Sequence, residues 1–349
     1  MWNGFAFAIP GELSLATGGY AYDRRVMAEC RRAVCTVNHV ALPSGFPFPA
    51  PDDLARTAHL LHAVPTGQPV LIDGLAMGAM PAALLRGLRR PLAALVHHPL
   101  ALETGLDERQ SATLRTSERA ALAEAAMVIA TSASTAGLIE RDYGVARPRL
   151  TVAVPGTDPR PRARGTGRPV RLLCVGAVIP RKAYGVLVDA LATLTGRDWT
   201  CHIVGASDRD ARETLALQSR IASRGLEGRI VLMGAISGEA LAQEFDAADL
   251  FVSSSLFEGY GMGLAEAVAC GLPIVATRAG AIPETVPAAA SLLAAPNDAQ
   301  SLAAAIGLLL DEPDRRRLMA DQAWQHAQTL PNWAQTAATI MTTLREMSR

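Results

Sequence analysis

Residues 253–273 read SSSLFEGYGMGLAEAVACGLP, and this stretch is the most informative part of the chain. The apolar run at 249–253 predicts a short buried strand, and the alanine-rich segment 264–270 predicts a helix that ends at Gly271. Gly259, Gly261 and Gly263 therefore fall in a loop between a strand and a helix. Glycines let the backbone approach a ligand, and the free amides of a helix N-terminus favour an anion such as phosphate.

Two carboxylates flank this loop, because Glu258 lies before its glycines and Glu266 lies in the helix that follows. A carboxylate accepts hydrogen bonds well from vicinal hydroxyl groups. An acid on each side of an anion site can hold two sugars joined through a diphosphate, which is the chemistry of a nucleotide-sugar. The residues expected to bind it are Glu258, Gly259, Tyr260, Gly261, Met262, Gly263, Leu264 and Glu266.

The glycine-rich loop has a second interpretation, the turn of a dinucleotide-binding Rossmann unit. Glu284 lies at about the twenty-residue spacing that this interpretation requires. A dinucleotide fingerprint, however, follows the first strand of its unit. The present loop follows several strand–helix alternations in its own half of the chain, so the nucleotide-sugar interpretation is preferred.

The composition is that of a protein that binds small molecules. Its 349 residues, 50% of them hydrophobic, are enough for two domains with separate cores. A formal net charge of zero provides no overall field toward nucleic acid. The five cysteines lack paired spacing, which favours reduced thiols. We identify neither a signal peptide nor an apolar run of about 18 residues, and we expect a soluble cytoplasmic protein.

Both halves of the chain alternate apolar strand-like runs with helical segments, which is typical of an α/β fold with parallel sheets. Residues 156–169 interrupt this alternation; they are rich in proline, glycine and arginine and predict a hinge. We therefore expect one Rossmann-like domain at 1–155 and another at 170–330. Because ligands of parallel sheets bind at the carboxyl ends of the strands, we expect the two sheets to face each other across an active-site cleft.

Arg181 and Lys182 follow the first strand of the second half, where that sheet's carboxyl end is expected. A planar guanidinium and a compact ammonium suit a leaving nucleoside diphosphate, which gains negative charge as it departs. A solvated pair of surface charges is the structural alternative.

The spacing of Glu258 and Glu266, together with the segments 269–277 and 280–284, resembles the donor site of retaining glycosyltransferases of family 4. The resemblance covers the whole C-terminal half. It implies the GT-B fold, in which two Rossmann-like domains face each other across a cleft. The N-terminal domain would then lie on the acceptor side, the domain at 170–330 would bind the donor, and a last helix at about 333–349 would pack back on the N-terminal domain.

The resemblance also assigns roles in the donor domain. Glu258 would hold the donor sugar, Glu266 the ribose, and Arg181 with Lys182 the diphosphate. Met233 and Gly234, at the end of another strand, would lie beside the nucleobase. The chain departs from the commonest family pattern by having Gly263 in place of proline and Ala183 in place of glycine, and neither position carries charge.

In the N-terminal half, Gly18 and Gly19 match the glycine pair that lets donor or acceptor approach the backbone in this family. His97 best matches a histidine that contacts the transferred sugar near its sixth carbon. A histidine hydrogen-bonded only for structure is the alternative. His98 and Glu284 are further possible site residues, and Glu284 can equally be a surface acid. His59 and His62 have helical spacing but no third ligand, so we expect no metal site.

From the resemblance we expect a metal-independent, retaining hexosyltransferase without a cofactor. It would move a sugar from a UDP- or GDP-linked donor, UDP being favoured, to a hydroxyl of a saccharide, a lipid-linked sugar or a small metabolite. A sugar phosphorylase or a nucleotide-sugar hydrolase on the same fold is one alternative. A non-catalytic nucleotide-sugar-binding protein is another.

Two further segments admit two interpretations each. Residues 43–51, with Phe46 and Phe48, either line the acceptor site or form a rigid proline-rich loop. Residues 81–90 can form a basic amphipathic helix that contacts a membrane surface, but leucine stripes of this kind more often face the core. Peripheral membrane contact is therefore not favoured.

Overall fold

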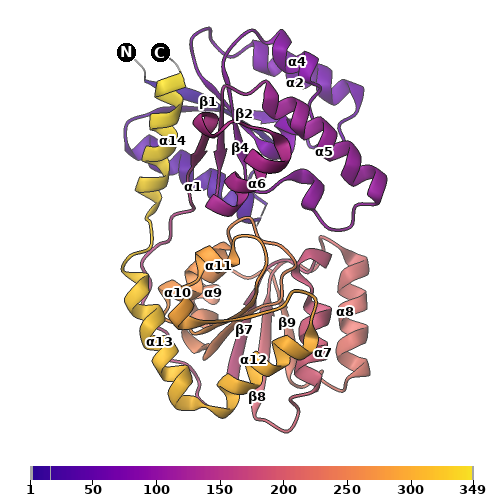
Figure 1. Cartoon of the computed structure of the whole chain (residues 1–349), viewed down its shortest axis with the longest axis vertical. Helices are drawn as coiled ribbons and strands as arrows, with labels where there is room; N and C mark the ends of the chain where they lie inside the picture. The colour runs from indigo at the N-terminus through magenta and orange to yellow at the C-terminus, as the bar shows by residue number, and fades with distance from the viewer. Residues whose placement is uncertain (1–2, 16, 348–349) are drawn as a thin grey trace. The chain divides into compact units, whose positions relative to one another are not determined.

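The computed structural model describes residues 3–15 and 17–347. The chain divides into two compact units, one formed by Met1–Gly156 with Pro331–Arg349 and the other by Thr157–Leu330 (Figure 1). Each unit has a six-stranded sheet, and every strand pair in both sheets is parallel. The predicted α/β class with two parallel sheets is therefore confirmed.

The first unit contains strands β1 to β6 in the spatial order β2-β1-β3-β4-β5-β6. The strands are β1 (Gly4–Pro10), β2 (Thr36–Leu42), β3 (Val70–Asp73), β4 (Leu92–Val96), β5 (Met127–Ala130) and β6 (Leu150–Val152). The helices are α1 (Gly18–Arg32), α2 (Pro51–His62), α3 (Gly74–Met77), α4 (Ala82–Gly87), α5 (Glu108–Ala123), α6 (Ala133–Tyr143) and α14 (Trp333–Met347), with short 3-10 turns η1 (Leu100–Leu102) and η2 (Arg147–Arg149).

The second unit repeats this plan with the order β12-β11-β10-β7-β8-β9. Its strands are β7 (Val170–Val175), β8 (Trp199–Val204), β9 (Ile230–Gly234), β10 (Leu250–Ser253), β11 (Ile274–Thr277) and β12 (Ser291–Ala294). Its helices are α7 (Tyr184–Ala192), α8 (Ala211–Ser223), α9 (Gly238–Ala247), α10 (Met262–Ala269), α11 (Ile282–Thr285), α12 (Ala299–Asp311) and α13 (Pro313–Ala327), with 3-10 turns η3 (Pro180–Lys182) and η4 (Ala288–Ala290).

Each sheet changes its direction of winding once. In the first unit the chain goes from β1 outward to β2 and then returns to place β3 on the other side of β1. In the second unit it runs from β7 through β8 to β9 and then returns to place β10 beside β7. The carboxyl ends of the strands at such a reversal are where open α/β sheets bind ligands. The sheet order alone therefore predicts ligand sites at the loops after β1 and β3 and at the loops after β7 and β10.

Helix α14 belongs to the first unit although it ends the chain. It packs along α1, as Figure 1 shows, and the Trp333 ring lies edge-on to Tyr22 with the ring centroids 5.7 Å apart. Thr336 donates a hydrogen bond to the Val154 carbonyl at 2.8 Å. These contacts attach α14 to α1 and to the segment that follows β6.

The segment predicted as a hinge has no helix or strand at 157–169, and it runs along the second unit. The Ala163 amide donates to the Cys270 carbonyl at 2.8 Å, and Asp249 accepts from the Gly167 and Arg171 amides at 3.0 and 2.9 Å. Its lack of apolar periodicity therefore reflects a segment fastened mainly by polar contacts.

The leucines of residues 81–90 pack into the core of the first unit, which is the interpretation that the sequence favours. Leu85 and Leu88 are buried in the first unit, and Leu84 packs against the same cluster. Arg86 pairs with Glu124 at 3.1 Å. Within residues 3–15 and 17–347, none of the helices combines the length and apolar character that crossing a bilayer requires.

The two phenylalanines of loop 43–51 have different surroundings. Phe46 is 6% exposed and belongs to the core of the first unit, whereas Phe48 is 52% exposed. Phe46 therefore anchors the loop.

Candidate functional site

The site of the second unit forms where its sheet reverses direction. Arg181 and Lys182 lie in η3, after β7, and Glu258 lies in the loop between β10 and α10. The Leu256 amide donates to the Arg181 carbonyl at 2.8 Å, and the Ser254 hydroxyl donates to the Lys182 carbonyl at 2.7 Å. The two loops are thus joined through their backbones, and they bring together residues more than seventy positions apart in the sequence.

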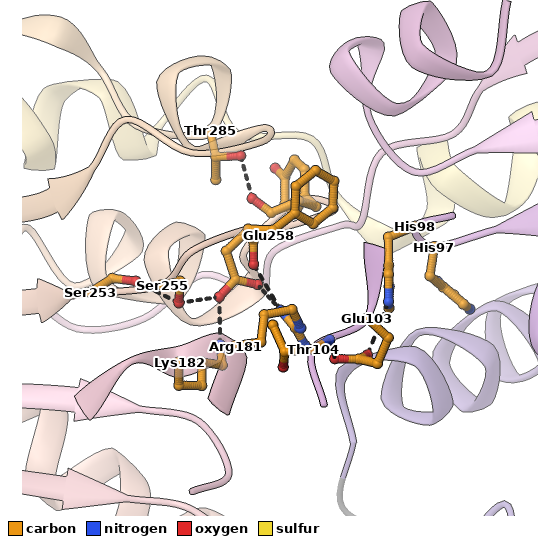
Figure 2. A network of polar contacts seen from close by, with 12 residues as sticks. His97, His98, Glu103, Thr104, Arg181, Lys182, Ser253, Ser255, Glu258 and Thr285 are labelled. Atoms are coloured by element: carbon orange, nitrogen blue, oxygen red, sulfur yellow. Dashed lines mark hydrogen bonds and ion pairs between the residues drawn. The ribbon is translucent and has the colours of Figure 1, made fainter. Parts of the chain in front are cut away.

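The Glu258 carboxylate is the centre of a charged network, shown in Figure 2. It receives hydrogen bonds from Lys182 Nζ at 2.6 Å, from Ser255 Oγ at 2.7 Å and from Arg181 Nη1 at 3.3 Å. Burial alone would raise the pKa of this carboxyl, but Lys182 and Arg181 outweigh it and lower the pKa to about 2. Two cations facing one carboxylate leave the network with a net positive charge.

The loop that carries Glu258 is closed from the other side by α11 and the turn before it. The Ala281 amide donates to the Glu258 carbonyl at 2.9 Å, and Thr285 Oγ1 donates to the Tyr260 carbonyl at 2.6 Å. A Cβ atom on Gly280 would lie 2.3 Å from the Glu258 carbonyl oxygen, and Gly280 has φ +54°. Glycine is therefore needed at 280, both for its conformation and for the close approach of the two backbones.

Helix α10 begins beside this network without a side-chain cap. Its N-cap residue, Gly261, has φ 95° and provides no side chain to accept from the first amides. Gly263 lies against β7, where an added Cβ would be 3.5 Å from Val175. The first turn of α10 therefore presents amide donors and the positive end of the helix dipole next to Lys182 and Arg181, which is a favourable place for a phosphate.

Glu266, the second predicted acid, lies within α10 in a different environment. Its side chain is 30% exposed, and its Oε1 accepts from Arg160 Nη2 at 3.1 Å. Burial raises the pKa of this carboxyl, while the charge of Arg160 acts to lower it. Arg160 lies in the predicted hinge, so sequence reasoning did not place it in the site.

The other predicted donor-side residues differ in burial. Met233 and Gly234 end β9, and both are half-buried. Tyr260 and Leu264 are buried beside the Glu258 loop, whereas Met262 is half-buried in the first turn of α10. Glu284 is exposed on α11.

The Ala183 backbone has φ 48° and ψ 41°, which is the left-handed region, directly after Lys182. A residue with a Cβ atom is strained there and glycine is not. Ala183 therefore carries a backbone strain that a glycine at this position would avoid.

In the first unit, the predicted His97 follows β4 and meets two carboxylates that the sequence analysis did not single out. Its Nε2 lies 3.3 Å from Asp23 Oδ1 and 3.5 Å from Asp73 Oδ2. Asp23 lies in α1 and is fully buried, and Asp73 ends β3 and accepts from the Leu75 amide at 2.7 Å. The strand reversal at β1 and β3 therefore places both acids against the histidine.

Burial and charge oppose each other in this cluster. Burial acts to lower the pKa of His97, but the two carboxylates together raise it to about 10. Burial raises the pKa of Asp23 to about 7 although His97 acts to lower it. The three ligand-type atoms lie within 4.8 Å of one another, so among the described residues Asp23, Asp73 and His97 are the group that could hold a metal ion.

The predicted glycine pair lies next to His97. Gly18 and Gly19 begin α1, whose N-cap Thr17 accepts from the Tyr20 amide. A Cβ atom on Gly19 would lie 3.3 Å from His97 Cδ2. His98 turns to a different partner, Glu103, at 3.1 Å. His97 and Gly19 are thus neighbours, while His98 belongs to a separate contact.

Two family models match this chain. Residues 15–160 match the model described as "Glycosyltransferase Family 4", and residues 169–312 match the one described as "Glycosyl transferases group 1". The D-inositol 3-phosphate glycosyltransferase of Nocardia farcinica is 32% identical over 242 residues, which are 64% of this chain and 53% of that protein. The chain therefore spans about half the length of this curated relative.

Two solved structures have the same architecture over nearly the whole chain. Sucrose-phosphate synthase from Thermosynechococcus elongatus superposes with a TM-score of 0.83 at 21% identity, covering 98% of each chain. HepE of Anabaena, solved in complex with UDP and glucose, superposes with a TM-score of 0.77 at 19% identity, covering 98% of this chain and 100% of HepE. At these identities the similarity concerns the fold, and it confirms the predicted GT-B class.

Proposed function

Because the chain belongs to glycosyltransferase family 4, as its sequence predicts, we propose that it transfers a hexosyl group from a nucleoside-diphosphate sugar to a hydroxyl acceptor. The observation that carries this proposal is the convergence of Arg181, Lys182 and Glu258 beside the uncapped start of α10. This arrangement suits a diphosphate, because two cations and a helix N-terminus offer positive charge from fixed positions.

The proposed chemistry is electrostatic. As the bond between the sugar and the diphosphate breaks, negative charge builds on the leaving phosphate. Arg181 and Lys182 are already held in place by Glu258, so they can stabilise that charge without reorganising. Since these side chains supply the positive charge, we propose that the reaction requires no metal ion and no cofactor.

We further propose that the reaction retains the configuration of the sugar without a protein nucleophile. The Glu258 carboxylate accepts from Lys182, Arg181 and Ser255, and a carboxylate so engaged is a poor nucleophile. The acceptor hydroxyl would instead attack on the face from which the diphosphate leaves, and the departing phosphate would take its proton. Glu258 would orient the transferred sugar and Glu266 the ribose.

UDP is the favoured nucleotide, since HepE was solved with UDP and glucose. For the acceptor, the names of two similar proteins suggest phosphorylated polyols and sugars as a first panel, namely D-inositol 3-phosphate and the acceptor of sucrose-phosphate synthase. Neutral saccharides and lipid-linked sugars complete that panel.

The test incubates the purified protein with UDP- and GDP-sugars and the acceptor panel, and measures the released nucleoside diphosphate and the product by mass spectrometry. We expect the release of UDP to depend on the acceptor. We also expect NMR of the product to show the same anomeric configuration at the transferred sugar as in the donor. Turnover that needs only water would indicate a hydrolase, and turnover that needs orthophosphate would indicate a phosphorylase. Binding without turnover of any pair would indicate a non-catalytic binding protein.

A further inference from the structure

Arg160 makes a contact that neither the sequence pattern nor the proposed reaction requires. Its Nη2 donates to Glu266 Oε1 at 3.1 Å, across 106 positions of sequence. Its guanidinium also lies over the Phe245 ring, 5.1 Å from the ring centroid. A guanidinium is well suited to such a place, because its planar face stacks on an aromatic ring while its edge donates to a carboxylate.

The segment around Arg160 is fixed to the same helix that carries Glu266. The Ala163 amide donates to the carbonyl of Cys270, directly after α10, at 2.8 Å. Arg160 and Glu266 are 22% and 30% exposed at their side chains, so the pair is largely shielded from water. The backbone therefore holds Arg160 against α10 independently of its contact with Glu266.

Only one oxygen of Glu266 is used by this pair. Within the described residues, Oε1 accepts from Arg160 and Oε2 makes no hydrogen bond. A hydrogen bond at one oxygen restricts the rotation of the carboxylate, so it also narrows the range of directions in which the other oxygen can accept. A pair of vicinal hydroxyl groups needs such a directed acceptor.

We propose that Arg160 is a positioning residue for Glu266, which it orients so that the other carboxylate oxygen binds the ribose hydroxyls of the nucleotide. This inference rests on the proposed function, which makes Glu266 the ribose-binding acid. The electrostatic surroundings of the Glu266 carboxylate agree with this role of Arg160. Burial and the nearby Asp158 raise the pKa of Glu266, and Arg160 is the group that lowers it.

The experiment compares two ligands by calorimetry, UDP and 2′,3′-dideoxy-UDP, on the full chain. In Arg160→Met we expect UDP to bind about tenfold more weakly, the scale of a lost hydrogen bond to a charged group. The dideoxy ligand should bind the variant and the unmodified protein equally, because it has no ribose hydroxyls for Glu266 to bind. Arg160→Lys should recover part of the UDP affinity, since it restores the charge but not the planar fork.

Arg162→Met is the matched control, because it removes an arginine of the same segment that pairs with Asp321 rather than with Glu266. It should bind both ligands as the unmodified protein does. Equal weakening of both ligands in Arg160→Met would overturn the proposal and assign Arg160 a structural role. Unchanged or tighter UDP binding would also overturn it, since Arg160 would then be irrelevant to the ribose or in competition with it. Failure of the unmodified protein to bind UDP would refute the proposed nucleotide instead.

Discussion

The charged network of the second unit consists of Glu258 and the two cations that hold it. The three groups share one short network, in which Lys182 lies 2.6 Å and Arg181 3.3 Å from the carboxylate oxygens. Their positions are set by backbone bonds between the loops after β7 and β10. Rigid charges of this kind act on a transition state more strongly than mobile surface charges.

Replacing either cation by alanine should therefore lower turnover by about a hundredfold or more, the loss expected when one stabiliser of transition-state charge is removed. The measurement is the steady-state rate of UDP release in Arg181→Ala and in Lys182→Ala. Arg220→Ala is the control, because Arg220 pairs with Asp189 and is 48% exposed. Normal rates in both cation variants would contradict the electrostatic role.

The two acids should separate in their ligand preferences. Glu266→Gln should weaken binding of UDP and of UDP-glucose alike, since both ligands carry the ribose. Glu258→Gln should leave the affinity for UDP unchanged, because Lys182 and Arg181 remain to bind the diphosphate. It should reduce the additional affinity that UDP-glucose gains over UDP through its glucose group. Calorimetric titration of both ligands into both variants measures this. The same loss for both ligands in both variants would refute the division of roles.

The close packing of the Glu258 loop against the turn before α11 depends on Gly280. An alanine there would combine a left-handed conformation with a Cβ atom 2.3 Å from the Glu258 carbonyl oxygen. We expect Gly280→Ala to lower the free energy of unfolding by more than the roughly 1 kcal/mol that a left-handed non-glycine residue costs by itself. Turnover should fall as well, because Glu258 is displaced.

Gly238→Ala provides the comparison for this substitution. Gly238 begins α9, and an added Cβ meets nothing within 4 Å. Its urea unfolding curve should match that of the unmodified protein or shift slightly toward stability. Coincident unfolding midpoints for Gly280→Ala and Gly238→Ala would show that the loop tolerates movement and that the packing argument is wrong.

The His97 cluster couples the stability of the whole first unit to pH. The folded-state pKa of Asp23 is raised to about 7 and that of His97 to about 10, both above their ordinary values of 3.8 and 6.5. The folded state therefore binds more protons than the unfolded state between about pH 4 and pH 10. Stability conferred by such groups is lost as pH rises through that interval.

Asp23→Asn should reduce this dependence on pH. It removes one of the two groups whose pKa is raised, and it removes the carboxylate that lies nearest to His97, the other such group. We expect the thermal unfolding temperature of the variant to fall less than that of the unmodified protein between about pH 6 and pH 9. Asp142→Asn, a change at a half-buried position on α6 of the same unit, should keep the original slope. A steeper slope in Asp23→Asn would contradict the assigned direction.

Much of this architecture follows from local sequence patterns. Apolar runs alternating with amphipathic segments identify the two parallel sheets, and the carboxyl ends of parallel strands bring Arg181, Lys182 and Glu258 together. Arg160 lies in a segment without periodicity and meets Glu266 across 106 positions, so no local pattern reveals it. Asp23 and His97 are likewise separated by 74 positions, and only the order of β1, β3 and β4 unites them with Asp73.

In this account the second unit binds a nucleoside diphosphate through its own cations and Glu266. The most direct measurement is calorimetric titration of UDP into the full chain in the presence of a chelator, repeated with an Arg181→Ala, Lys182→Ala double variant. We predict saturable binding at one site per chain that persists in chelator and falls at least about tenfold in the double variant. No saturable binding by UDP or GDP, strict dependence on a divalent metal, or equal binding by the double variant would contradict the claim.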